Sequence, residues 1–176
     1  MTFHITPQFK IDTDLFHLEF SEGRRQDGAH VRQTIGNATI ILPEGFKWES
    51  PKMQLWLNKV LKEVMRDHAK AILTRLLRET AEKYGYSYNR LTIKDVRTRW
   101  GSCSGLNNIN LSLWLLLAPS HLVLYVIKHE LAHLRQMNHS PLFWAEVDKM
   151  TDGRAKALEK EMKNFALSLY RSGVKN

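Results

Sequence analysis

Two histidines and a glutamate occur with the spacing His129-Glu130-x-x-His133. In an α-helix of about 3.6 residues per turn, the two histidines lie about 40° apart on one face, so both imidazoles can reach one metal ion. Glu130 projects about 100° from His129, where it can contact a water molecule on the metal without being a ligand. This is the arrangement of the H-E-x-x-H zinc motif, in which the glutamate is the general base of a hydrolase.

A third histidine follows at the spacing of a longer zinc motif. His139 lies six residues after His133, as the last ligand does in H-E-x-x-H-x-x-G-x-x-H, although Gln136 replaces the glycine. Asn138 could form the turn that leaves the helix, because asparagine tolerates the left-handed region. Ser140-Pro141 then predicts the start of another helix. The sequence therefore predicts one zinc ion per chain, bound by the three histidines with a fourth position open to water.

Several other residues are candidates for the same site. Glu146, 13 residues after His133, is the alternative third ligand, but it requires a second helix in a particular position, so we favour His139. Tyr125, Arg97 and Arg99 are candidates for a second group that stabilises charge during the reaction. For Tyr125 we favour a core tyrosine, and the alternative for the arginines is that they anchor the turn around Trp100. Cys103 lies in a glycine- and serine-rich turn and is typical of a small packing residue.

The helix that begins at Ser120 and carries the motif is apolar around most of its circumference. Only a narrow sector containing His121, Lys128 and Arg135 remains for water, so the helix is expected in the core. Buried polar groups without partners cost on the order of 2–7 kcal/mol each. A metal ion would satisfy the two histidines and the glutamate together.

The remaining elements follow from periodicity and turn residues. Residues 1–25 predict an irregular arm or weak strands, and Val31–Ile35 with Ala38–Leu42 predicts a hairpin. A long helix is expected over Pro51–Tyr84, ended by Gly85.

The second half begins with two alternating segments. Leu91–Val96 and Asn108–Leu113 predict a pair of antiparallel strands. Helices are expected from Ser120, over Pro141–Met150, and after Gly153.

Composition is typical of a globular protein in a reducing compartment. The 176 residues suggest one domain, and a single cysteine excludes an internal disulfide. The N-terminus lacks the apolar region of a signal peptide, and the most apolar run, Leu111–Ile127, is interrupted by Pro119. We therefore expect a cytoplasmic protein with no membrane partner.

The formal net charge of +8 favours acidic partners. Nucleic acid or a nucleotide could bind weakly to a basic surface. A stripe on the long helix would carry it, formed by Lys59, Lys62, Arg66 and Lys70. Intermixed acidic residues make a solvated, ion-paired face the simpler interpretation.

Several short motifs together are similar to one family. The chain resembles the YgjP-like zinc metallopeptidases, related to the SprT-like and WLM groups within the zincins, through Arg99-Trp100-Gly101-Ser102-Cys103-Ser104, Ile109-Asn110-Leu111, Pro119, His129–Leu134, Asn138-His139-Ser140 and Phe143-Trp144. The resemblance implies a zincin-like α+β fold with a small N-terminal β element, a small mixed sheet and a central zinc-binding helix. It also implies a hydrolase with one zinc ion, His129, His133 and His139 as ligands, and Glu130 as base.

The same resemblance suggests how the chain is divided and how substrate binds. Residues 1–49 would form the N-terminal arm and hairpin, and 50–176 the catalytic domain, together one compact unit. By analogy with zincins, Asn108–Leu113 would be the sheet edge above the cleft, to which an extended peptide could add as a further strand. A proline at Asn110 would then impair cleavage.

We expect a zinc metallopeptidase that acts on a peptide or protein through a zinc-bound water activated by a glutamate. The first alternative is a metal-dependent nucleoside triphosphate (UTP-type) pyrophosphatase, as some similar proteins are described. That chemistry usually needs magnesium held by several carboxylates, and no such cluster occurs near the motif. The second alternative is a basic nucleic-acid-associated protease or binding module of the SprT-like kind. An open three-ligand site argues against purely structural zinc.

Overall fold

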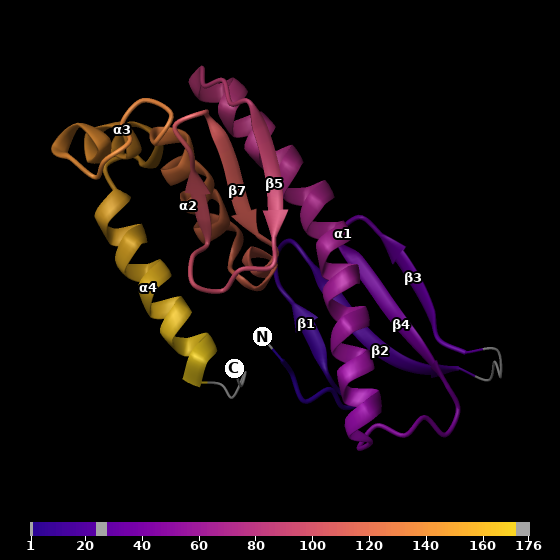
Figure 1. Cartoon of the computed structure of the whole chain (residues 1–176). Helices are drawn as coiled ribbons and strands as arrows, with labels where there is room; N and C mark the ends of the chain where they lie inside the picture. The colour runs from indigo at the N-terminus through magenta and orange to yellow at the C-terminus, as the bar shows by residue number, and fades with distance from the viewer. Residues whose placement is uncertain (1, 24–27, 172–176) are drawn as a thin grey trace.

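Two small β-sheets and four α-helices make up residues 2–23 and 28–171, which the computed structural model describes (Figure 1). The predicted α+β class, with a small N-terminal β element and a central helix that carries the H-E-x-x-H motif, is confirmed. Parts of the expected N-terminal and catalytic segments, at residues 1, 24–27 and 172–176, lie outside the described residues.

The N-terminal sheet has the strand order β1-β2-β4-β3. Its strands are β1 (Lys10–Asp12), β2 (His17–Gly23), β3 (His30–Thr34) and β4 (Asn37–Pro43). The predicted hairpin is present as β3 and β4, joined where Gly36 adopts a φ of 88°. The segment expected to be an arm or weak strands supplies β1 and β2, and β2 pairs with β4 in parallel.

Helix α1 (Pro51–Tyr84) runs past both sheets (Figure 1). Its buried residues recur at steps of three and four along its length, which fixes one face in the core. The helix ends as predicted at Gly85, which has a φ of 68° and whose N–H bonds back to the last turn.

The second sheet has the order β5-β7-β6, formed by β5 (Arg90–Lys94), β6 (Gly101–Cys103) and β7 (Asn108–Ser112). Two sequence predictions are wrong here. Strands β5 and β7 are parallel rather than antiparallel, and β7 is the central strand rather than an edge. Asn110 therefore pairs with Thr92 on one side and Ser102 on the other, so a proline there would break the sheet instead of blocking a substrate.

The cause is the segment between β5 and β6, which crosses the end of β7. The Trp114 Nε1–H donates to Asp95, while the Ser112 hydroxyl donates to the Val96 carbonyl and the Ser112 N–H to the Trp100 carbonyl. Held in this way, the chain enters β6 on the far side of β7. One edge strand of this sheet is consequently β6, the segment that sequence reasoning had assigned to a turn.

Helix α2 (Ser120–Ala132) is surrounded by other elements. It follows the short 3₁₀ helix η1 (Leu113–Leu117) and packs against α1, β6, α3 (Pro141–Thr151) and α4 (Ala155–Arg171). Figure 1 shows α2 between the second sheet and α4. The burial predicted for the motif helix is thus observed, with His121 and Arg135 exposed. Within the described part of the chain, no helix has the length and apolar character needed to cross a membrane.

Candidate metal centre

The three predicted histidines come together at the end of α2. One ring nitrogen from each of His129, His133 and His139 lies within 4.8 Å of the others, and this is the single such cluster of possible metal-binding groups among the described residues. The Nε2 atoms of His129 and His139 are 3.1 Å apart. His129 lies in the last turn of α2, His133 is the C-cap residue that follows it, and His139 lies in the loop before α3.

The backbone after α2 turns back toward the histidines through hydrogen bonds of the 3₁₀ type. The sequence had predicted a left-handed residue at Asn138 instead. Leu134 N–H donates to Leu131 O and Arg135 N–H to Ala132 O, the three-residue spacing of a 3₁₀ turn. Among the described non-glycine residues, only Asn107 and Asp152 have a positive φ. The left-handed turn predicted at Asn138 is therefore wrong, because the last turn of the helix already redirects the backbone.

Hydrogen bonding and burial prepare the imidazoles to bind a metal. His133 Nδ1 lies 3.0 Å from the Gln136 carbonyl, which can only accept, so Nδ1 carries the proton and Nε2 is left as a lone-pair donor. Burial, with smaller effects from the neighbouring histidines, lowers the pKa of His129 to about 3. Burial also lowers the pKa of His133. Both rings are therefore neutral at pH 7, as a ligand must be.

Phe143 forms an apolar platform beneath the three imidazoles, a role that sequence reasoning missed. Its ring centroid lies 4.8, 4.4 and 4.7 Å from those of His129, His133 and His139, and the residue is fully buried. The Ser140 hydroxyl accepts the Phe143 N–H, which confirms the predicted helix start and fixes the platform. The only local signal was an aromatic residue in the first turn of α3.

Glu130 is held beside the histidines without a fixed partner. It is 5% exposed, and its Oε2 is buried with no hydrogen-bond partner in the described structure. Burial raises the pKa of this carboxyl to about 8, with the charge of Arg99 acting in the opposite direction. A carboxylate with such a raised pKa is suited to accept and return a proton near neutral pH.

Strand β6 passes directly against the Glu130 side chain. A Cβ atom on Gly101 would lie 2.6 Å from Glu130 Oε1 and 2.7 Å from its Cγ, closer than real Cβ contacts. Only glycine therefore lets the strand and the carboxylate occupy these positions together. Sequence reasoning had read Gly101 as a turn residue.

The alternative ligand Glu146 is engaged elsewhere. Its carboxylate accepts from the Tyr86 hydroxyl at 2.6 Å, from Arg135, and from Lys149 Nζ at 2.8 Å. The bond from Lys149, with the others, lowers the pKa of Glu146 to about 2. The residue is also absent from the cluster of convergent groups.

The other candidates lie near the site in different ways. Tyr125 is buried, and its ring centroid is 5.9 Å from that of His129. Arg99 is exposed on the segment before β6, whereas Arg97 is half-buried. Cys103 is half-buried with its Sγ 3.6 Å from the Ser104 carbonyl, and burial, with the nearby Glu130, raises the pKa of its thiol. These features agree with packing by the cysteine.

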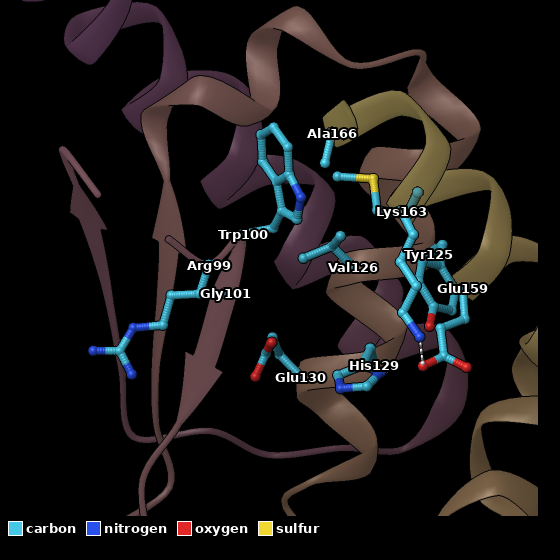
Figure 2. Close-up of a pocket in the computed structure, with 11 residues that line it drawn as sticks. Arg99, Trp100, Gly101, Tyr125, Val126, His129, Glu130, Glu159, Lys163 and Ala166 are labelled. Atoms are coloured by element: carbon cyan, nitrogen blue, oxygen red, sulfur yellow. Dashed lines mark hydrogen bonds and ion pairs between the residues drawn. The ribbon is translucent and has the colours of Figure 1, made fainter. Parts of the chain in front are cut away.

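A cavity of about 290 Å³ opens beside the histidines, between β6 and α4. Figure 2 shows Trp100, Val126 and Ala166 around it, with His129 and Glu130 at one end.

The donor set fits a divalent transition metal. Imidazole nitrogens bind zinc at about 2.0–2.1 Å, which places two ligands of a tetrahedral site roughly 3.3–3.4 Å apart. The 3.1 Å between the His129 and His139 nitrogens is close to this spacing. Three imidazole ligands also leave one tetrahedral position for a reactant, as in catalytic zinc sites.

Comparisons with known proteins find a family profile and solved structures that are similar to this chain. A family profile described as the YgjP-like metallopeptidase domain matches residues 17–165, which include all three histidines. One similar solved structure is the metallopeptidase zymogen abylysin of Pyrococcus abyssi, 28% identical, with 52% of this chain and 92% of that chain covered and a TM-score of 0.47. Another is the metallopeptidase zymogen jannalysin of Methanocaldococcus jannaschii, 20% identical, with 52% and 94% covered and a TM-score of 0.45. No curated protein matches the chain.

Proposed function

Because the chain belongs to the YgjP-like metallopeptidase family, we propose that it is a zinc-dependent peptidase with one zinc ion per chain. The ligands are the Nε2 atoms of His129, His133 and His139, and Glu130 is the general base. The observation that carries this proposal is the convergence of three imidazole nitrogens beside a buried carboxylate whose Oε2 has no hydrogen-bond partner among the described residues.

In amide hydrolysis, the metal ion, Glu130 and the residues that hold the imidazoles would have different roles. A bound zinc ion would polarise the scissile carbonyl and lower the pKa of a coordinated water molecule. Glu130 takes a proton from the attacking water as its oxygen bonds to the carbonyl carbon, and returns a proton to the departing amine when the C–N bond breaks. The Phe143 platform and the bond from His133 to Gln136 hold the imidazoles in place.

The substrate strand is proposed to add to β6, not to β7 as expected from sequence. The Ser112 N–H bonds to the Trp100 carbonyl and the Ser104 N–H to the Asn108 carbonyl. In an antiparallel pair, residues that bond to the partner strand alternate with residues whose backbone groups point away. Gly101 and Cys103 therefore direct their N–H and C=O groups to the free edge, next to Glu130.

The choice of third ligand gives the direct test. The purified His139→Ala variant should contain far less zinc than the wild type, because one of three protein ligands is lost. Glu146→Ala should retain near-normal zinc even if its melting temperature falls through the loss of its ion pairs. Zinc content by mass spectrometry and cleavage of a mixed peptide library should be measured on the same preparations. Zinc loss in Glu146→Ala with retention in His139→Ala would reverse the assignment.

Testing nucleoside triphosphates as substrates alongside the peptide library distinguishes a peptidase from the pyrophosphatase alternative. The proposal requires peptide cleavage that depends on zinc. Pyrophosphate release from nucleoside triphosphates by the zinc-loaded enzyme, with every peptide intact, would replace it with the pyrophosphatase alternative.

A further inference from the structure

We propose that Glu159 of α4 accepts a hydrogen bond from the Nδ1–H of His129 and holds this imidazole in the orientation that binds the metal. Glu159 is a positioning residue in this proposal and not a ligand. The inference rests on the metal site of the proposed function, but its test measures metal affinity and the imidazole itself and does not need turnover.

One nitrogen of His129 lacks a partner. Its Nε2 lies 3.1 Å from Nε2 of His139, inside the cluster of three imidazoles. The other nitrogen, Nδ1, is buried and has no hydrogen-bond partner among the described residues. When Nε2 of a neutral imidazole binds a metal, the proton is on Nδ1, so Nδ1 is a donor. A buried donor without an acceptor is destabilising, and the loaded site therefore needs an acceptor here.

The rings next to His129 do not supply this acceptor. His133 Nδ1 lies 3.0 Å from the Gln136 carbonyl, and metal-binding histidines usually donate their second N–H to a carbonyl or carboxylate in this way. The Phe143 and Trp144 rings have centroids 4.8 and 6.1 Å from that of His129. Neither ring carries an acceptor atom, because the indole nitrogen can only donate.

Glu159 is the carboxylate placed to accept this bond. Among the described residues, Glu130 and Glu159 are the two carboxylates that line the cavity beside His129. Glu130 lies against β6 and is the proposed base. Burial has the largest effect on the pKa of His129 and lowers it, whereas the negative charge of Glu159 acts to raise it. Figure 2 shows the His129 ring between the side chains of Glu130 and Glu159.

Two lysines keep the Glu159 side chain charged. Its carboxylate accepts hydrogen bonds from Lys163 Nζ at 2.8 Å and from Lys156 Nζ at 3.2 Å. The bond from Lys163, together with that from Lys156, outweighs burial and lowers the pKa of Glu159. A carboxylate has about four lone-pair sites, so it can accept from His129 and keep both lysines. The side chain is 26% exposed, which leaves it room to turn toward Nδ1.

Removing the Glu159 carboxylate should weaken metal binding. The zinc affinity of Glu159→Ala, measured by competition with a chromophoric chelator at pH 7.5, should fall about 10- to 100-fold, the usual cost of losing such a partner. Glu159→Gln should lose less, because its amide oxygen can still accept from Nδ1 but carries no full charge. Lys163→Ala breaks the shorter ion pair but keeps the carboxylate, so its zinc affinity should stay close to that of the wild type.

Two further variants are controls. Glu161→Ala removes a carboxylate of the same helix that pairs with His121, and it should bind zinc like the wild type. Tyr125→Phe removes the hydroxyl that could compete as acceptor, since the Tyr125 ring centroid is 5.9 Å from that of His129. Its zinc affinity should also be unchanged. A loss in Tyr125→Phe with none in Glu159→Ala would assign the bond to the hydroxyl and overturn the proposal.

The imidazole gives a second measurement without turnover. In the zinc-loaded wild type, ¹⁵N-edited NMR should detect the Nδ1 proton of His129 as a slowly exchanging signal, which should shift upfield and exchange faster in Glu159→Ala. The Nδ1 proton of His133 is the internal reference, because its bond to the Gln136 carbonyl is retained. If both responses are found but no peptide is cleaved, the proposed function fails and the role of Glu159 stands. Unchanged zinc affinity in a folded Glu159→Ala variant, or an unchanged His129 signal, would overturn it.

Discussion

At the scale of single residues, Glu130 and Gly101 depend on each other. The carboxylate can remain buried without a partner because the strand beside it carries no side chain at position 101. A conventional side chain there would push the carboxylate away from the histidines or displace β6. The reactivity of one residue is thus set by the absence of atoms on another.

Replacing Glu130 with glutamine separates a chemical role from a structural one. Glutamine keeps the shape of the side chain but cannot accept a proton, and general-base catalysis contributes about 10²–10⁴-fold. Turnover should fall by that order while zinc content and melting temperature stay near those of the wild type. Glu161→Gln removes an exposed carboxylate that pairs with His121 and is not part of the three-histidine cluster, and it is the control for loss of one carboxylate. A Glu130→Gln enzyme with wild-type turnover would end the catalytic assignment.

Gly101→Ala tests the close approach of β6. The added Cβ overlaps Glu130 Oε1, so the carboxylate or the strand must shift, and overpacking of this kind costs about 1–3 kcal/mol. A displacement of about 1 Å can reduce a rate by about 100-fold, so kcat should fall steeply while zinc remains bound. In Gly105→Ala, on the same hairpin, the new methyl group meets no atom within 4 Å and activity should be normal. Equal activity of the two variants would contradict the steric argument.

At the scale of elements, the site depends on a helix that was easy to predict and a strand that was not. The 129/133/139 spacing identified the histidines because helical periodicity is a local property of the sequence. Gly101-Ser102-Cys103 has turn-like composition, and it becomes a strand only because the bonds of Ser112 and Trp114 carry the preceding segment across β7. The position of Phe143 beneath the imidazoles could likewise not be predicted from local sequence, because its contacts with the histidines join α3 to α2.

Proline in β6 tests whether this strand receives the substrate. Cys103→Pro removes an N–H that points to the free edge, and edge strands tolerate proline on that side. Loss of one backbone hydrogen bond, worth about 0.5–1.5 kcal/mol, should lower kcat/KM about two- to twelvefold. Cys103→Ala keeps the N–H and should leave kcat/KM unchanged. The comparison fails to support strand addition if both variants cleave peptides equally well with full zinc content.

At the scale of the whole molecule, α1 connects the N-terminal sheet to the metal centre. The helix packs against β5, η1 and α2, and the Gly36 N–H between β3 and β4 donates to Nδ1 of its His68. These contacts support the proposal that residues 1–49 and 50–176 fold as one unit. The parallel pairing of β2 with β4 was not predictable, since it joins segments about 20 residues apart through contacts that local alternation does not encode.

The basic stripe on α1 is partly neutralised. Lys62 lies 3.2 Å from Asp95, and Arg66 lies 3.9 Å from Glu63. The ion-paired interpretation of this face is therefore favoured over the phosphate-binding one.

His68 makes the junction between α1 and the N-terminal sheet sensitive to acid. It is 5% exposed and stacks near Phe16, with ring centroids 4.8 Å apart, and its Nε2 is buried with no hydrogen-bond partner in the described structure. Burial lowers the pKa of His68 below its ordinary value of 6.5, and the nearby Asp67 offsets part of this effect. Above pH 6.5 the ring is neutral in both the folded and the unfolded chain, so it adds no pH dependence. Below pH 6.5 the unfolded chain takes up a proton more readily, and the free energy of unfolding decreases as the pH falls, by at most about 1.4 kcal/mol per pH unit.

His68→Asn isolates this contribution. Asparagine can still accept the Gly36 N–H but does not titrate, so the variant should be less stable than the wild type at pH 7.5 through lost packing with Phe16. The free energy of unfolding of both proteins should be measured with urea at pH 7.5, 6.5 and 5.5. A chelator in every sample prevents metal release from contributing to the pH dependence. The difference in free energy of unfolding between the two proteins should shrink toward pH 5.5, because only the wild type has a residue 68 that must stay neutral in the folded chain. A gap between His68→Asn and the wild type that is constant across the three pH values would show that His68 protonates equally in the folded and unfolded chain.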